Sequence, residues 1–308
     1  MSRVAVRVMH HIAMLVAGML AACTAPLPTT ASYTGSDYVV EMPIQQMIRF
    51  FRVHVPARGV GPVMPVILAF HGSSQTAEQL ETQTGLDAAA DRAGVIVVYV
   101  NAALGVWDVT GDLVDYGFDD VDFVHRVLDR LERDLVIDQR RVIAVGLSNG
   151  AVFVQRLACV MPERIAGFVA VEGTLIRRLA QDCPPGPPVG ALFLSGTEDQ
   201  FFGIHGDGAL FSIDSTMDFW ARRAHCRSPR VSVELPDTAH DGTVVWESRY
   251  SRCATRSVHV ELDSIVGGGH GWAGALHPPS RALYGVTTRN LSANEAIIRF
   301  LDRIAPAN

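Results

Sequence analysis

Residues 141–161 read RVIAVGLSNGAVFVQRLACVM, and this stretch gives the strongest indication of the fold. Its apolar, β-branched beginning predicts a strand buried on both faces, and residues 150–161 predict a helix. Between them GLSNG, at positions 146–150, is a Gly-x-Ser-x-Gly pentapeptide at a strand–turn–helix junction. Such a junction exposes its serine on a sharp turn, where the helix N-terminus stabilises negative charge. We therefore expect Ser148 to be a nucleophile, the alternative being a tight glycine turn without chemistry.

Strands and amphipathic helices alternate on both sides of this junction. Apolar runs at 64–70 and 95–100 suit strands of a parallel sheet, and residues 48–55 alternate as in an antiparallel edge strand. The remaining expected elements are helices at 77–93, 119–135 and 212–224, strands at 165–171, 189–195, 231–235 and 257–262, and a final helix behind a Ser292-x-x-Glu295 capping box. The alternation predicts a single α/β domain over residues 39–308, with a mostly parallel sheet and helices on both faces.

A serine nucleophile needs a base, and that base needs an acid to orient it. In hydrolases with this elbow the acid follows the serine in the chain, and the histidine follows the acid. The strand at 189–195 ends in GTED at 196–199, where an acid lies beyond the carboxyl end of a parallel strand. Asp199 or Glu198 is the candidate acid, and Asp199 is favoured because it lies further into the loop. A solvated turn acid is the alternative.

His270 is the candidate base. It lies in the loop GGGHGW at 267–272, where glycines on both sides let the backbone deliver the imidazole into a cleft. His240 and His277, each in a polar or proline-containing loop, are the alternatives.

The loop at 71–74 (HGSS) follows the strand at 64–70, the place where such hydrolases put one backbone donor of the oxyanion hole. We expect the N–H groups of Ser73 and Asn149 to be the two donors, and His71 to brace the loop. Trp107 and Trp272 are candidates for the walls of the substrate cleft, with buried packing as the alternative.

The composition excludes several other chemistries. All 26 basic residues are arginines, against 32 acidic residues, for a net charge of −6. Without lysine the chain cannot build a P-loop, a protein kinase site, a Schiff base or a Ser-Lys hydrolase. The acidic balance argues against a nucleic-acid partner. No organic cofactor or metal is implied.

The N-terminus has the pattern of an export signal. Arg3 and Arg7 precede an apolar run at 12–20, which is shorter than the roughly 20 residues that span a bilayer. The run leads into LAAC at 20–23, which resembles a bacterial lipobox. In such signals the cysteine becomes the lipidated first residue of the mature protein.

We therefore expect residues 1–22 to be a lipoprotein-type signal peptide, Cys23 the lipid attachment site and residues 23–38 a flexible tether. An ordinary cleaved signal with an incidental cysteine is the alternative. The protein would be exported, as a cell-envelope lipoprotein or in secreted form, and would contact a membrane only through the lipid.

The other four cysteines, an even number in an exported chain, suggest two disulfides. The absence of any Cys-x-x-Cys spacing argues against zinc. Three pairings are possible; we favour the sequence neighbours, Cys159 with Cys183 and Cys226 with Cys253.

Several of these motifs together resemble the α/β-hydrolase esterases that include poly(3-hydroxybutyrate) depolymerases, feruloyl esterases and acetyl-xylan esterases. The resemblance runs from about Val63 to Arg303 and rests on the 71–72 loop, on GLDAAAD at 85–91, on DDV at 119–121, on GLSNGA at 146–151 and on the Gly-Gly-Gly-His-x-Trp block ending at Trp272. It implies the triad Ser148, Asp199 and His270. The loop after Asp199 departs from the family's usual sequence, so the resemblance does not name the ester.

Together these features predict a serine esterase of small or oligomeric hydroxyalkanoate, feruloyl or acetyl esters. A serine peptidase on the same fold and a non-catalytic binding lipoprotein are the alternatives.

Overall fold

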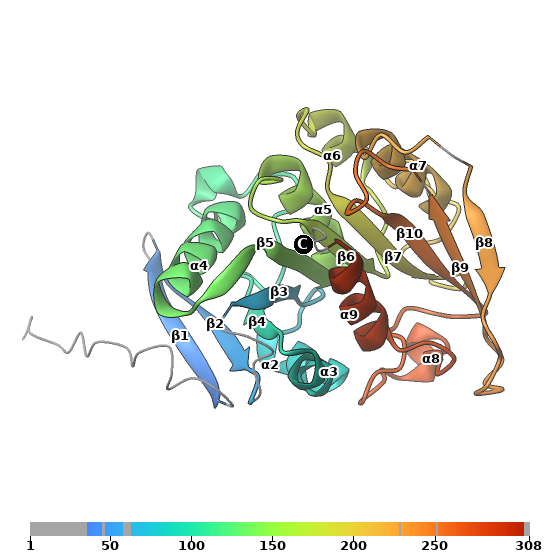
Figure 1. The fold of residues 1–308 in the computed structure, drawn as a ribbon, viewed down its shortest axis with the longest axis horizontal. Coiled ribbons are helices and arrows are strands. Elements are labelled where there is room, and N and C mark those ends of the chain that lie inside the picture. The colour runs from blue at the N-terminus through green and yellow to red at the C-terminus, as the bar shows by residue number, and fades with distance from the viewer. Residues whose placement is uncertain (1–35, 45–46, 58–62, 228, 251, 305–308) are drawn as a thin grey trace, which may run out of the picture.

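The computed structural model describes residues 36–44, 47–57, 63–227, 229–250 and 252–304. The expected signal peptide, Cys23 and most of the expected tether lie outside these residues. Ten strands form one sheet in the order β1-β2-β4-β3-β5-β6-β7-β10-β9-β8 (Figure 1). They are β1 (Ser36–Ile44), β2 (Met47–Val55), β3 (Met64–Phe70), β4 (Ile96–Val100), β5 (Ile137–Leu147), β6 (Gly167–Val171), β7 (Gly190–Gly196), β8 (Val231–Glu234), β9 (Val244–Tyr250) and β10 (Val260–Val266).

The centre of the sheet is parallel. The strands from β4 to β10 in that order run the same way, and antiparallel strands flank them at both ends. Every residue of β3, β4 and β7 is buried, as expected of parallel strands covered on both faces. The six parallel strands end at one edge of the sheet, which we call the carboxyl edge.

Helices cover both faces of the sheet (Figure 1). The side chains of α4, α5 and α7 pack in one hydrophobic core, and those of α2, α3 and α9 pack in a second core on the opposite face. The helices are α2 (Ala77–Thr84), α3 (Leu86–Ala93), α4 (Asp120–Asp134), α5 (Asn149–Val160), α6 (Arg177–Asp182), α7 (Ile213–Arg223), α8 (Arg281–Tyr284) and α9 (Ala293–Ile304), with a 3-10 turn η2 (Val114–Tyr116). Among the described residues, every helix falls short of the length and apolarity that crossing a bilayer requires.

The predicted α/β architecture is confirmed, with differences in detail. The helix expected at 77–93 is two helices, because Gly85 adopts a left-handed φ of +58° that ends α2 and begins α3. The strand expected at 48–55 is present as β2, but the prediction that it lies at the edge is wrong, because β1 pairs with its outer side. β1 begins at Ser36, so the last residues of the expected tether belong to a strand.

Candidate active site

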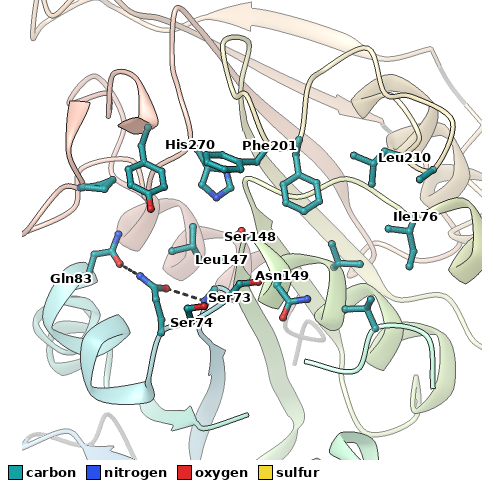
Figure 2. A pocket seen from close by; sticks show the side chains of 18 of the residues that line it. Ser73, Ser74, Gln83, Leu147, Ser148, Asn149, Ile176, Phe201, Leu210 and His270 are labelled. Atoms are coloured by element: carbon teal, nitrogen blue, oxygen red, sulfur yellow. Dashed lines mark hydrogen bonds between the residues drawn. The ribbon is translucent and has the colours of Figure 1, made fainter. Parts of the chain in front are cut away.

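Ser148 occupies the sharp turn between β5 and α5 (Figure 2). Its φ of +57° and ψ of −119° are angles that residues other than glycine rarely adopt. Two glycines make the turn possible. A Cβ on Gly146 would lie 2.1 Å from the backbone oxygen of Gly150, and a Cβ on Gly150 would lie 2.3 Å from that of Phe70. Ser148 lines a cavity, and its hydroxyl makes no hydrogen bond with the rest of the described chain.

His270 and Asp199 meet at the carboxyl edge because β7 and β10 are parallel neighbours. Nδ1 of His270 lies 2.8 Å from Oδ2 of Asp199, the distance of a charge-assisted hydrogen bond. His270 lines the same cavity as Ser148 (Figure 2). Of the three residues predicted as a triad, Ser148 and His270 therefore line one cavity, and Asp199 lies buried against His270.

Asp199 is buried and held in its ionised form. Its other oxygen, Oδ1, accepts the backbone N–H groups of Phe201 at 2.7 Å and Phe202 at 3.1 Å. Burial disfavours the charge, but the bond from His270 and these two N–H groups outweigh it and lower the pKa of Asp199. An ionised Asp199 can orient the imidazole and stabilise it once it has accepted a proton.

Neither the alternative acid nor either alternative base combines a carboxylate–imidazole pair with a place in the cavity. Glu198 points into solvent, and its backbone N–H bonds to Gly268. The side chain of His240 is 80% exposed, and its ion-pair partner is Asp237. His277 lines the cavity, but its side chain has no carboxylate partner among the described residues.

The residues of the two expected oxyanion donors line the cavity together with Ser148 (Figure 2). Asn149 is the first residue of α5, so its N–H is one of the unpaired donors of a helix N-terminus. In the loop after β3, Gln75 accepts the N–H of Gly72 at 3.0 Å and is itself bonded to Gln83 at 2.9 Å. The backbone N–H groups of Ser73 and Asn149 find no acceptor within the part of the chain that the structure describes.

His71 braces this loop, as expected. Its Nδ1 donates to the carbonyl oxygen of Gly72 at 2.8 Å, and its Nε2 accepts the N–H of Ala102 at 3.1 Å. This pair of bonds requires a neutral imidazole, and burial lowers the pKa of His71 accordingly. Trp107 adds a bond from its indole N–H to the carbonyl oxygen of His71 at 2.8 Å.

The prediction that Trp107 and Trp272 line the cleft is wrong. Trp107 is 2% exposed and stacks on Phe153, with ring centroids 4.8 Å apart. Trp272 is 1% exposed and donates its indole N–H to Asn294 at 2.8 Å. Both indoles brace loops at the site. Trp107 packs against the loop after β3, and Trp272 lies in the loop of His270, two positions further along the chain.

Other aromatic side chains take the place of the tryptophans in a cavity of about 960 Å³. Phe201 is 55% exposed, and its ring centroid lies 4.8 Å from that of His270. Phe202 and Tyr284 flank the imidazole further out. Phe201 and Phe202 come two and three residues after Asp199, so their closeness to the predicted acid was the signal available in the sequence. No local pattern marked Tyr284. Apolar side chains line one part of the cavity, namely Val109, Leu147, Val152, Ile176 and Leu210.

A second buried acid, Glu172, stands behind Asp199. It immediately follows β6, just as Asp199 follows β7, so the rule that selects Asp199 would also have selected Glu172. Glu172, Asp199 and His270 hold ligand atoms within 4.8 Å of one another, a grouping that could bind a metal. However, Nδ1 of His270 lies at hydrogen-bond distance from Oδ2 of Asp199, which leaves no room for an ion between these two atoms.

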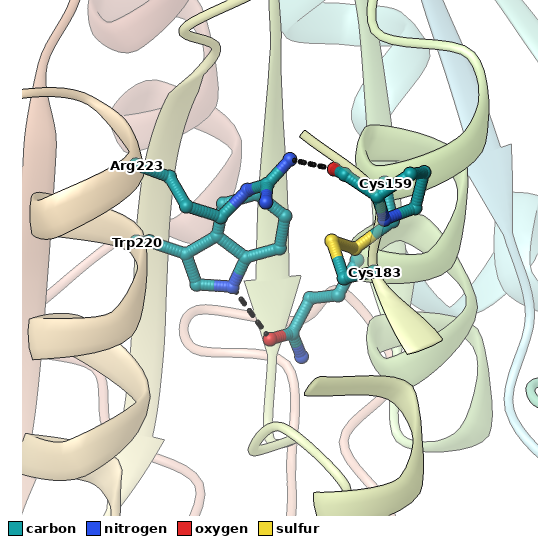
Figure 3. Close-up of a disulfide and its surroundings, with 6 residues drawn as sticks. Cys159, Cys183, Trp220 and Arg223 are labelled. Carbon is teal, nitrogen blue, oxygen red and sulfur yellow. Dashed lines mark hydrogen bonds between the residues drawn. A yellow bond between two sulfur atoms is a disulfide. The ribbon is translucent and has the colours of Figure 1, made fainter. Parts of the chain in front are cut away.

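The two expected disulfides join Cys159 to Cys183 and Cys226 to Cys253. The first ties α5, which begins next to the nucleophile, to the segment that leads into β7 and Asp199 (Figure 3). Around it, Trp220 of α7 donates to Gln155 at 3.0 Å, and Arg223 donates to the carbonyl oxygen of Pro184 at 2.7 Å. The disulfide therefore holds α5 to the segment before β7, and the two hydrogen bonds join α7 to both.

Known proteins are similar to this chain in sequence and in fold. No protein-family model matches the sequence. The chain is 29% identical over 284 residues to the "Putative esterase NocK" of Nocardia uniformis subsp. tsuyamanensis, covering 85% of this chain and 81% of that protein. It is 28% identical over 127 residues to the bifunctional acetylxylan esterase/xylanase XynS20E of Neocallimastix patriciarum, covering 41% of this chain and 18% of that protein.

The fold is also that of a solved esterase. The acetyl xylan esterase from Aspergillus awamori superposes with a TM-score of 0.60 at 14% sequence identity, over 87% of this chain and 99% of that one. The sequence likeness points to esterases, and the structural likeness independently gives the same α/β fold. Sequence relatives among the esterases, together with this α/β fold, support a carboxylic-ester hydrolase.

Proposed function

We propose that this carboxylic-ester hydrolase works through a triad of Ser148, His270 and Asp199. The observation that carries the proposal is the bond of 2.8 Å between Nδ1 of His270 and Oδ2 of Asp199, because His270 lines the same cavity as Ser148 of the elbow. An imidazole fixed in this way keeps Nε2 available as a base.

In the proposed reaction the hydroxyl of Ser148 attacks the ester carbonyl while His270 accepts its proton. Asp199 stabilises the imidazolium that forms. The N–H groups of Ser73 and Asn149 bind the oxyanion, each worth about 2.7–4 kcal/mol of transition-state stabilisation. His270 then returns the proton to the leaving alcohol, and a water molecule activated by the same histidine releases the acyl group.

We propose acetyl, feruloyl or hydroxyalkanoate esters as substrates. Acetylxylan and feruloyl esterases are among the relatives by sequence, and the resemblance in the sequence motifs adds the hydroxyalkanoates. Among the described residues no arginine lines the cavity, and Asp207 is its one acidic lining residue. Such a lining favours an uncharged ester over an anionic one, because an anion would lack a cationic partner.

Replacement of the nucleophile tests the proposal. Ser148→Ala is expected to lower the kcat for short p-nitrophenyl esters by about 10⁴-fold or more, because the remaining groups cannot form the acyl-enzyme. Ser215→Ala, on the exposed side of α7, is the matched control and should retain wild-type activity. Ester hydrolysis that survives in Ser148→Ala would refute the assignment. Faster cleavage of peptide amides than of esters by the wild-type enzyme would favour a peptidase instead.

We also propose that the protein is exported and anchored through a lipid on Cys23. The two disulfides support an oxidising compartment. Cys23→Ala should release the protein from the membrane fraction of a bacterial host; equal membrane binding of the variant would contradict the anchor.

A further inference from the structure

Glu172 is a buried acid in contact with the proposed triad, and the reaction as described leaves it without a role. The residue is 1% exposed. It follows the last residue of β6, next to β7 in the sheet, and its backbone N–H bonds to the carbonyl oxygen of Leu194 at 2.9 Å. Its carboxyl group lies within 4.8 Å of the ligand atoms of Asp199 and His270, behind the pair as seen from the cavity that it does not line.

The hydrogen bonds around this acid leave one atom unmatched. Oε2 of Glu172 accepts the N–H of Gly196 at 2.9 Å. Oε1 is buried and receives no hydrogen bond of good geometry from any described residue, although the backbone N–H of Gly271 and the carboxylate of Asp199 both lie close to the carboxyl group. Two carboxylate oxygens cannot bond to each other unless one carries a proton. Since Asp199 already accepts His270, Phe201 and Phe202, the group that can carry this proton is Glu172.

We propose that Glu172, in its neutral form, is a positioning residue of the triad, donating a carboxylic O–H hydrogen bond to Asp199. The inference rests on the proposed function, because it assigns Glu172 a role through Asp199 and His270. The bond fixes the Asp199 carboxylate from behind, so that Oδ2 stays directed at the imidazole. It also keeps a single negative charge in the buried group.

The backbone supports a role that depends on the side chain. Glu172 has a φ of +51°, in the left-handed region that glycine adopts readily and other residues adopt at a cost. A glycine would satisfy this turn with less strain, so the fold alone gives no reason for a glutamate here. Strained residues of this kind cluster at functional sites, where the surrounding structure holds them in place.

The charges of Asp199 and His270 around Glu172 also favour its neutral form. Burial, followed by the negative charge of Asp199, raises the pKa of Glu172 well above its usual range. The ionisable groups that face it are Asp199 from the loop after β7 and His270 from the loop after β10. Among the described residues no arginine forms an ion pair with Glu172. A second negative charge would therefore be unbalanced, and it would hold a proton on His270 when the imidazole has to act as a base.

Two variants with opposite expectations test the proposal. Glu172→Gln keeps an acceptor for Gly196 and an N–H donor for Asp199, so its kcat should stay within about threefold of the wild type. Glu172→Leu is similar in size but keeps neither group, so its kcat should fall about 10- to 100-fold. The KM should be unchanged in both, because Glu172 does not line the cavity. Thermal melts check that both variants fold.

The pH profile of kcat/KM separates a neutral from an ionised Glu172. If Glu172 is neutral, Glu172→Gln leaves the acidic limb where it is in the wild type. If Glu172 were ionised, the variant would remove a negative charge beside the imidazole and move that limb about one pH unit or more to lower pH. A displaced limb overturns the proposal. So does a folded Glu172→Leu with wild-type kcat, or an inactive but folded Glu172→Gln.

One readout does not depend on catalysis. The infrared spectrum near neutral pH should contain protonated carboxylic-acid carbonyl absorption that is weaker in Glu172→Gln by the contribution of one carboxyl group, and equal absorption in the variant and the wild type would contradict the proposal. If Ser148→Ala retained ester hydrolysis, the proposed function would fail while this difference in absorption still reported the protonation of Glu172. The two failures are therefore distinguishable.

Discussion

Asp199 joins two loops through one carboxylate. Its two oxygens receive His270 from the loop after β10 and two N–H groups from its own loop. An amide at this position has one oxygen and one NH2 group, so it cannot accept from both sides. The residue therefore matters for orientation as well as for charge.

Asp199→Asn should leave the fold intact and lower kcat about 10⁴-fold, because the amide favours the wrong tautomer of His270. Activity against p-nitrophenyl acetate and a thermal melt check the two parts of this prediction. Asp115→Asn, at an exposed position, serves as the control. A folded Asp199→Asn with more than about a tenth of wild-type kcat would show that another residue orients the base.

At the residue scale, the sequence predicts best what depends on local geometry. The glycines around Ser148 and His270 mark positions where the backbone approaches other chain segments closely, and these can be read from the sequence. Whether an aromatic residue lines a cleft depends on distant packing. Trp107 is therefore buried under Phe153, whereas Phe201 takes the exposed place beside the imidazole.

Among the elements, β10 carries an unusual charge arrangement. Asp263 is 5% exposed and lies directly opposite Glu247 of β9 in the antiparallel register. Burial, with the negative charges of Glu247 and Glu261, raises the pKa of Asp263 to about 7. Like charges facing each other across strands destabilise a sheet, so this pair should oppose folding once both groups are ionised.

Asp263→Asn should therefore stabilise the protein in a pH-dependent way. The folded pKa of about 7 lies above the ordinary aspartate value of 3.8, so the native state keeps a proton that the unfolded chain releases. The cost of Asp263 is absent below the unfolded pKa, grows as the pH rises, and is complete above the folded pKa at no more than about 4 kcal/mol. Urea unfolding of variant and wild type near pH 5 and pH 8.5 measures the difference. A gain that does not increase with pH would contradict the prediction.

The disulfide between Cys159 and Cys183 spans a sequence separation of 24. A loop of this size predicts a contribution of about 3 kcal/mol to the free energy of unfolding, chiefly by restricting the unfolded chain. The double variant Cys159→Ala/Cys183→Ala should lose about this much in guanidinium unfolding. An unchanged unfolding free energy would mean that the bridge does not constrain the unfolded state.

The elements that could be predicted from the sequence are those with strong periodicity. The buried strands β3 to β7 and the helices α4 and α5 follow from apolar runs and helical spacing. β1 and β9 were not predicted from the sequence, because their burial depends on neighbours distant in the chain. The break between α2 and α3 depends on the left-handed conformation of Gly85, which spacing alone does not reveal.

At the scale of the whole molecule, the parallel sheet explains why four segments distant in sequence form one site. β3, β5, β7 and β10 end at the carboxyl edge, and each is followed by a loop carrying one part of the proposed machinery: Ser73, Ser148, Asp199 and His270. The absence of lysine in the sequence is compatible with this arrangement, since backbone N–H groups supply the oxyanion donors.

In the proposed mechanism Ser148 is an activated nucleophile. Labelling of the intact protein with a fluorophosphonate probe, followed by mass-spectrometric mapping of the adduct, measures this activation directly. Our account predicts a single adduct on Ser148, absent from Ser148→Ala and formed far more slowly in His270→Ala. An unlabelled wild-type protein, or an adduct on another residue, would contradict it.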